Sequence, residues 1–214
     1  VATGQAGALL EVQHCGVAVA LMWPSAKPEL LFSSCYTPTA ARGCATKVSG
    51  RTILEIDNRP AAQVYVEWTG SRALAASLAQ EVRPQPILPL TALQPIGLRF
   101  EKPAVTLQGD APLREFNSLL HPGAITAGDG LMCLAGGIAQ GDVLVGMVAQ
   151  REELVDHIKA AVGEELQGRG GSGEICGALV VYCGGCAMQI REFLPDVARS
   201  FGDAFQHKPF LGLF

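Results

Sequence analysis

Two cysteines, Cys183 and Cys186, stand three residues apart in ICGALVVYCGGCAMQI, the stretch from residue 175 to 190. Thiol–disulfide exchange uses a C-x-x-C pair of this spacing at the start of a helix, where the pKa of a thiol can be lowered. The same spacing supplies half of the ligands of a structural zinc site. These residue types therefore raise two chemistries, redox exchange and metal binding.

The position of the pair in the chain favours neither chemistry. Thioredoxin-like proteins carry C-x-x-C near the first strand of a β-α-β pattern, whereas this pair follows a late strand predicted at 175–182. A zinc site needs two further ligands, and the candidates are Cys176 and His207. Cys176 precedes Cys183 by seven residues, an odd number, which places the two on opposite faces of a strand. We therefore expect no metal site.

A structural interpretation of C-G-G-C fits its surroundings better. Small residues let the end of a strand turn tightly into a helix, and Gly184 and Gly185 let a backbone approach closely. Such a turn can also line a ligand pocket. We therefore predict that Cys183, Gly184, Gly185 and Cys186 contribute to a ligand-binding site.

Catalytic motifs are absent from the sequence. A hydrolase with Cys183 as nucleophile needs a histidine base, and none of the four histidines has a supporting motif: His14, His121, His157 and His207. G-x-S-x-G, H-E-x-x-H and P-loop patterns do not occur, and GRGGSG (168–173) follows a helix, unlike a phosphate-binding loop. We expect a non-catalytic protein without a cofactor. A cysteine-dependent redox enzyme or hydrolase is the third-ranked alternative.

Composition narrows the class of protein further. Of the 214 residues 49% are hydrophobic and 17% charged, which favours an ordered fold with a large core. The net charge of −4 and the scattered Lys and Arg give no reason to bind nucleic acid. No apolar run reaches the ~18–20 residues of a membrane span, and no signal peptide is evident. Seven cysteines, an odd number within mostly apolar runs, favour free thiols and a cytoplasmic location.

Hydrophobic periodicity predicts alternating strands and helices. A helix at 60–69, with Asn58 as N-cap, carries Tyr65 and Trp68 on one apolar stripe. Tyr65 is a further candidate for stacking on a ligand, although an aromatic on such a stripe is usually part of the core. The proline-rich segment 83–90 is predicted to be an extended connector. We expect other strands at 16–22, 29–34, 51–56, 96–101, 104–107, 131–135, 142–149, 175–182 and 208–214, and helices at 71–82, 151–166 and 194–205.

Two stretches resemble the FIST domain family of intracellular sensory modules. KVSGRTILEIDNRPAAQVYVEWTG (47–70) is similar to the segment where the N-terminal half of that family passes into the C-terminal half. GGIAQGDVLVGMVAQREELVD, ICGALVVYCGGC and HKPFLGLF, within 136–214, resemble its later strands and turns. Cys186 stands where the family tends to have Arg, and the family continues beyond a final strand at which this sequence stops.

The resemblance implies an α/β fold, with an α+β layered arrangement in which mixed β-sheets are packed with helices. It implies that residues 1–46 are the tail of an N-terminal-like half and 47–214 a C-terminal-like half. It also implies a non-catalytic sensory or recognition domain in signal transduction that binds a small ligand such as an amino acid. The alternative is an adaptor in a larger protein assembly, such as a ubiquitin-ligase substrate receptor, so the expected partner is a small molecule or a protein.

Overall fold

The computed structural model describes residues 34–102, 114–134, 136–168 and 175–213, with a few isolated positions nearer the N-terminus. The chain divides into two units, residues 1–32 and 33–214. In the first unit, β1 (Ala2–Thr3) pairs antiparallel with β2 (Glu11–Val12). The strands predicted at 16–22 and 104–107, and nearly all of that at 29–34, lie outside the described residues. The following paragraphs concern the second unit.

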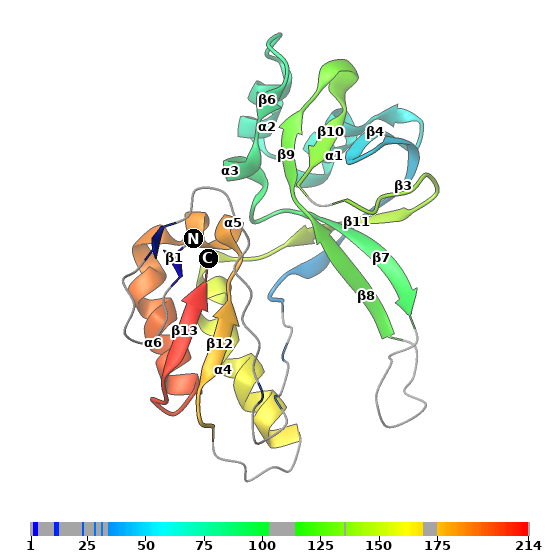
Figure 1. Ribbon diagram of the computed structural model, residues 1–214. Coiled ribbons are helices and arrows are strands. Elements are labelled where there is room, and N and C mark those ends of the chain that lie inside the picture. Colours follow the sequence, from blue (N-terminus) through cyan, green and yellow to red (C-terminus); the bar gives the residue numbers. More distant parts are fainter. Residues whose placement is uncertain are drawn as a thin grey trace. The chain divides into compact units, whose positions relative to one another are not determined.

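A nine-stranded antiparallel sheet is the larger of the two sheets in the described part of the second unit (Figure 1). Its order is β6, β9, β10, β4, β3, β11, β7 and β8, with β5 paired to β4. The predicted strands at 51–56, 96–101, 131–135 and 142–149 are confirmed within it. The bounds are β3 (Thr37–Ser49), β4 (Thr52–Ile56), β5 (Arg59–Pro60), β6 (Gln85–Pro86), β7 (Ile96–Lys102), β8 (Arg114–Leu120), β9 (Pro122–Ile125), β10 (Leu131–Cys133) and β11 (Val143–Val148).

Two helices, α1 (Ala61–Thr69) and α2 (Arg72–Leu78), contribute side chains to the first of two hydrophobic cores. Helix α3 (Leu88–Thr91) follows the core residue Ile87, and a 3₁₀ turn η1 (Ala127–Asp129) follows β9. Val64 and Tyr65 of α1 pack in one cluster with Ile53 and Ile56 of β4, all nearly inaccessible to solvent. The apolar stripe that the sequence predicted for this helix is thus its core-facing side.

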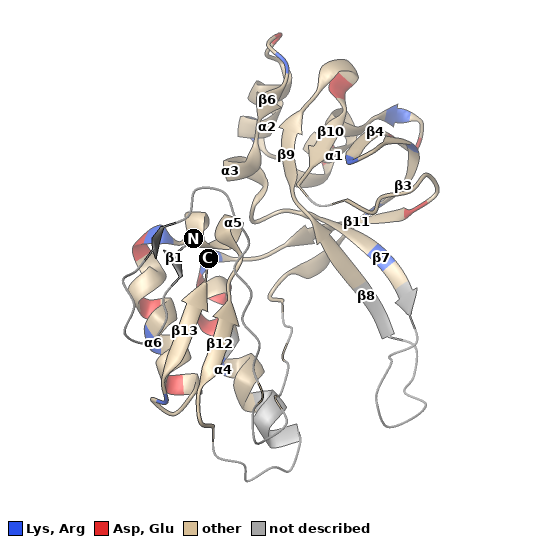
Figure 2. Ribbon diagram, viewed as in Figure 1, with Lys and Arg blue, Asp and Glu red and all other residues tan. Residues whose placement is uncertain are grey.

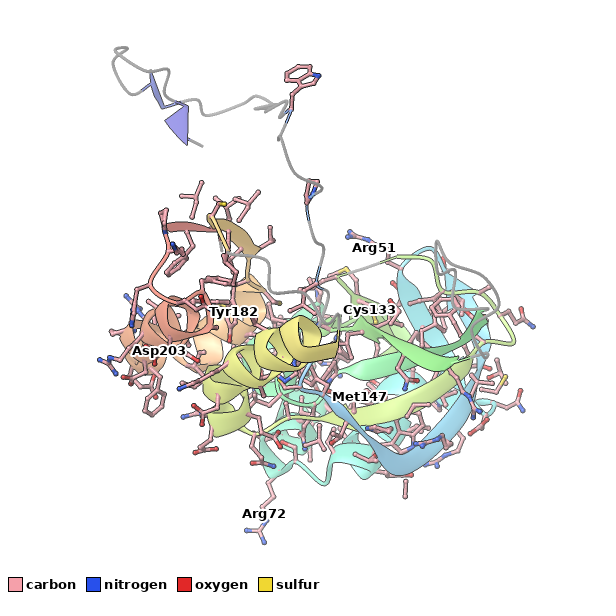
Figure 3. The ribbon with its side chains drawn as sticks, turned by 90° about the horizontal axis from the view of Figure 1, so that it is seen from below. Arg51, Arg72, Cys133, Met147, Tyr182 and Asp203 are labelled. Carbon is pink, nitrogen blue, oxygen red and sulfur yellow. The ribbon has the colours of Figure 1, made fainter. Side chains whose placement is uncertain are left out.

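The second core lies under the C-terminal elements. These are α4 (Arg151–Gly168), β12 (Ala178–Val181), α5 (Gly184–Gln189), the 3₁₀ turn η2 (Arg191–Phe193), α6 (Leu194–Ala204) and β13 (Phe210–Leu213). Strands β12 and β13 pair in parallel. Tyr182, labelled in Figure 3, packs with Val197 and Phe201 of α6 in this core. The predicted α/β class, with mixed sheets and helices, is confirmed.

Strand β11 joins the two cores. Leu144 belongs to the first core, whereas Val145 and Met147 belong to the second. Since successive side chains of a strand point to opposite faces, β11 is buried on both sides. This explains why DVLVGMVA is a nearly continuous apolar run.

Several local predictions were wrong. Asn58 does not cap α1: it lies in the β4–β5 turn with φ 61°, and Pro60 is the N-cap residue, without a side-chain cap. The connector at 83–90 contains the short strand β6 and the short helix α3. Strands β3, β8 and β9 were not predicted. In β3 only Ala45 is fully buried, so its composition carries little of the signal of a buried strand.

In the described part of the chain, positive and negative side chains are intermixed and do not form separate patches, as Figure 2 shows. Helix α6, for example, carries Asp196, Arg199 and Asp203, and Arg199 forms an ion pair with Asp196. None of the described helices is long and apolar enough to cross a membrane.

Replacing Gly43 of β3 with alanine is expected to destabilise the fold. A Cβ atom there would lie 2.6 Å from Cγ2 of Ile56 and 2.8 Å from Oδ2 of Asp57. Because Ile56 is buried and cannot move freely, we expect the free energy of unfolding to fall by about 1–3 kcal/mol in urea titrations. The control is Gly163→Ala in α4, where no described atom lies within 4 Å and alanine should stabilise by about 0.5–1 kcal/mol. Equal stability of Gly43→Ala and the wild type would contradict the packing at β3.

Candidate functional site

The C-G-G-C turn joins β12 to α5 through Tyr182 and Cys183. Cys183 is the N-cap residue of α5, with extended backbone angles (φ −64°, ψ 122°), and its side chain is exposed. Cys186, one turn further on, is buried at 6% exposure. The sequence therefore places one thiol of the pair in solvent and the other in the second core.

Gly184 and Gly185 do not have the predicted role of letting another backbone segment approach closely. Neither is among the glycines with positive φ, so the backbone of the turn does not require them. A Cβ atom at Gly184 would meet no described atom within 4 Å, and one at Gly185 would lie 3.7 Å from Sγ of Cys183. Their absent side chains therefore leave open space beside Cys183, instead of admitting another backbone segment.

Tyr36, just before β3, contacts the buried thiol from 150 residues away. Its Oη donates a hydrogen bond of 2.6 Å to the carbonyl of Ala92, because a carbonyl can only accept. Oη also lies 3.2 Å from Sγ of Cys186. Either atom could be the donor in this second contact. Tyr36 thus contacts the buried Cys186 thiol while its own hydroxyl is held by Ala92.

The two thiols have opposite shifts in acidity. The pKa of Cys183 is lowered to about 5, chiefly by a hydrogen bond from the Cys186 thiol. The backbone amides of Cys186 and Gly185, though not in capping geometry, and His121 lower it further against partial burial. The hydrogen bond to Cys183 and burial raise the pKa of Cys186 well above 9. At neutral pH the pair is therefore one thiolate and one thiol.

His121, between β8 and β9, completes this cluster. Its ring meets that of Tyr36 edge-on, with centroids 5.9 Å apart at 79°, and is hydrogen-bonded to the backbone of Ala92. Burial lowers the pKa of His121, so the ring is neutral. Its Nε2 is buried and has no hydrogen-bond partner among the described residues. We call Tyr36, His121, Cys183 and Cys186 the thiol cluster.

Tyr65, the remaining predicted ligand residue, lies elsewhere. Its side chain is 1% exposed in the first core, and its Oη donates a 2.5 Å hydrogen bond to the carbonyl of Gln94. It is therefore not brought together with the C-G-G-C turn. Binding of a ligand by Tyr65 or by the four residues of the turn stays a prediction.

A surface hollow of about 240 Å³ lies beside the far end of α5. Three glutamine side chains and an apolar wall surround it, and Gln189 of α5 also donates a 2.9 Å hydrogen bond to the carbonyl of Pro89 in α3. The amides offer both donors and acceptors without a charge. The lining residues are Pro89, Leu90, Leu93, Gln94, Val148, Ala149, Gln150 and Gln189.

A metal centre is not formed by the described residues, since no three His, Cys, Asp or Glu side chains among them are grouped to hold an ion. Cys176, a candidate ligand from the sequence, is exposed near the start of β12. No disulfide bond joins cysteines in the described part of the chain.

Sequence reasoning missed Tyr36 and the hollow, and treated His121 as a loop residue without a supporting motif. Tyr36 reaches Cys186 only through tertiary packing, so no local spacing signals it. The one available signal was the sequence around His121, where a buried run ends at His-Pro between two strands.

Comparison with known proteins gives one match. The family model of the FIST C domain matches residues 61–214, which include α1, the hollow and the whole C-G-G-C turn. No curated protein and no solved structure gives a significant match. FIST C domains are associated with sensory modules of signal transduction, which are generally non-catalytic. The chain belongs to the FIST C domain family.

Proposed function

We propose that this chain is a non-catalytic sensory domain of signal transduction that binds a small amino-acid-like ligand in the hollow beside α5. The observation that carries the proposal is the lining of the hollow. Gln94, Gln150 and Gln189 supply amide donors and acceptors suited to a ligand with ammonium and carboxylate groups. Leu90 and Leu93 supply an apolar wall for a side chain, the mixture that small-molecule sites have.

Position in the fold supports the same function. The hollow lies where α3, the end of β11 and the end of α5 meet, so a ligand there contacts elements from three distant parts of the sequence. Tyr65 holds the carbonyl of Gln94 from the core side. A ligand that pulls on Gln94 or Gln189 therefore acts on segments already connected to the first core and to α3. Such connections are what a sensory domain needs to convert binding into a change of shape.

Thermal unfolding with a panel of the twenty L-amino acids tests this proposal. A ligand at 100 times its Kd stabilises the folded state by about 2.7 kcal/mol, which raises Tm by about 5–10 °C in a chain of this size. Leu90→Trp fills the hollow and should abolish the shift. The matched control is Leu179→Trp, because Leu179 lies on β12 at 58% exposure and does not line the hollow. The proposal fails if no amino acid shifts Tm, or if Leu90→Trp binds as the wild type does.

An adaptor or structural role is the second candidate, and one surface favours it. Leu179, Val181, Leu211 and Leu213 alternate along β12 and β13 with exposed fractions of 58, 80, 61 and 48%. They form one apolar face of a parallel pair, and parallel sheets are usually covered on both faces. If this face binds a second copy, light scattering will give twice the chain mass, and Val181→Glu will restore the monomer. If the protein is a monomer at all concentrations, binding of a second copy is contradicted and the ligand-binding function remains.

A further inference from the structure

We propose that Cys183 and Cys186 form a dithiol–disulfide site that exchanges with low-molecular-weight disulfides, Cys183 attacking and Cys186 resolving. This inference concerns the thiol cluster and is independent of the hollow. The geometry supplies three requirements of such a site: an accessible attacking sulfur, a second cysteine one helical turn from it, and groups that hold the second sulfur in place.

Cys183 meets the first requirement. Its side chain is exposed, and the two following residues have no side chains. Because a Cβ at Gly184 would meet no described atom within 4 Å, a disulfide can approach Sγ along this side of the turn. Exposure of the attacking sulfur is what separates reactive from buried structural cysteines.

Cys186 meets the second and third requirements. Cys183 is the N-cap residue of α5, and Cys186 lies one turn further in the same helix, which is the placement that C-x-x-C exchange sites use. The Cys186 thiol is hydrogen-bonded to that of Cys183. Oη of Tyr36 lies 3.2 Å from Sγ of Cys186, and Ala92 in turn holds Tyr36. A disulfide bond of about 2.05 Å would therefore join neighbouring residues of one helical turn. Burial protects the resolving thiol from external reagents until the first bond has formed.

The thiolate of Cys183 attacks one sulfur of a disulfide R–S–S–R, the S–S bond of the reagent breaks, and R–S⁻ leaves. Cys186 gives its proton to that thiolate, forming R–SH, and its sulfur attacks Sγ of Cys183. The mixed disulfide breaks, the second R–S⁻ leaves, and Cys183–Cys186 is joined. The two protein sulfurs are oxidised and the reagent is reduced by two electrons.

The position of the pair beside His121 agrees with this assignment. A neutral imidazole with an unpartnered Nε2 lies next to the site, close enough that His121 and Cys183 shift each other's acidity. A turn with a purely structural function needs neither this orphaned acceptor nor an exposed first thiol. The late position of C-x-x-C in the chain, which argued against exchange, does not alter these contacts.

Oxidised glutathione is the probe for the test. The reduced protein is incubated with it at pH 7, and the products are identified by intact mass and peptide fragmentation. We expect the wild type to lose two hydrogens at Cys183–Cys186 without retaining glutathione. Cys186→Ser should keep one glutathione on Cys183, with a lifetime at least tenfold longer than in the wild type. Cys183→Ser should react at least tenfold more slowly.

Two controls make the result specific. Cys176→Ser removes an exposed thiol upstream of the pair and should behave as the wild type. Cys35→Ser removes the half-buried thiol next to Tyr36 and should still form Cys183–Cys186. A disulfide that maps to Cys35, or a Cys186→Ser protein that retains no glutathione, would overturn the proposal. If Cys186→Ser does not fold, the wild-type result alone tests the proposal: a disulfide mapped to Cys183–Cys186 supports it, and any other location contradicts it.

Discussion

Phe201→Ala is expected to lower the free energy of unfolding by about 3–5 kcal/mol. Phe201 of α6 is 4% exposed at the centre of the second core. Its ring meets Tyr182 edge-on at 6.3 Å and lies 5.9 Å from Phe205 and 5.8 Å from Phe210. Truncation leaves a cavity under α6, β12 and β13 at once, and the surrounding rings cannot fill it without losing their own contacts.

Urea unfolding, followed by circular dichroism, measures this effect. The control is Phe193→Ala in η2, where 40% of the side chain is exposed and the expected loss is below about 1 kcal/mol. Because Tyr182 directly precedes Cys183, the loss of Phe201 should also loosen the thiol cluster. Equal losses for the two variants would show that the aromatic cluster is not the centre of this core.

The second large effect is the pH dependence of alkylation at Cys183. With a pKa of about 5, this thiol is half ionised at pH 5, whereas a thiol with a pKa of 9 is about 10⁻⁴ ionised there. The ionised fractions thus differ by about 5,000-fold at pH 5. Because a thiolate of lower pKa is a weaker nucleophile, each Cys183 thiolate reacts roughly 60-fold more slowly, which offsets part of this difference. We therefore expect native Cys183 to react with iodoacetamide on the order of 10²-fold faster at pH 5 than in the urea-unfolded chain, and about equally at pH 7.

Substitution of Cys186 identifies the cause of this acidity. Cys186→Ala removes the hydrogen bond that contributes most to lowering the pKa of Cys183, so the midpoint of the alkylation profile should move up. Cys186→Ser keeps an O–H donor and should move it less. A profile that still rises tenfold per pH unit between pH 6 and 8 in the wild type would contradict the low pKa.

The lowered pKa of Cys183 also makes the stability of the fold depend on pH. The pKa of Cys183 is about 5 in the folded chain and near its ordinary value of 9 when unfolded. The unfolded chain therefore binds more protons between these values, and the contribution of Cys183 to stability rises with pH across this window. It is fully present above pH 9 and is lost as pH falls through 5. Solvent screening reduces its size, because the side chain is exposed.

Prediction from the sequence succeeded where a local pattern decided the structure. The stripe on α1, the acidic first turn of α4 and the apolar run of β11 each predict their element, because burial of one or both faces dictates the residue types. Strand β3 escaped prediction because its residues TPTAARGCATKVS are mostly small or polar. It is fixed instead by pairing with β4 and with β11, about 100 residues later.

Some features of the candidate site could likewise be predicted from the sequence, and others could not. The C-x-x-C spacing and the strand-to-helix turn are visible in the sequence, and both are present in the structure. The largest cause of the lowered pKa of Cys183 is the Cys186 thiol, which the C-x-x-C spacing supplies, whereas Tyr36 and His121 reach the pair only through tertiary packing. From the sequence, the late position of C-x-x-C in the chain was the argument against thiol exchange. In the structure, the side chains that contact the two cysteines determine their reactivity.

Helix α5 is six residues long, with Cys183 before its first residue and Gln189 at its last. The thiol cluster and the hollow thus lie at opposite ends of one short helix, which Gln189 links onward to Pro89. If disulfide formation displaces Gln189, it changes the affinity of the hollow, and thermodynamic reciprocity then requires an occupied hollow to change the midpoint potential of the thiols by the same free energy. A redox titration with and without bound amino acid would therefore measure the coupling from either end.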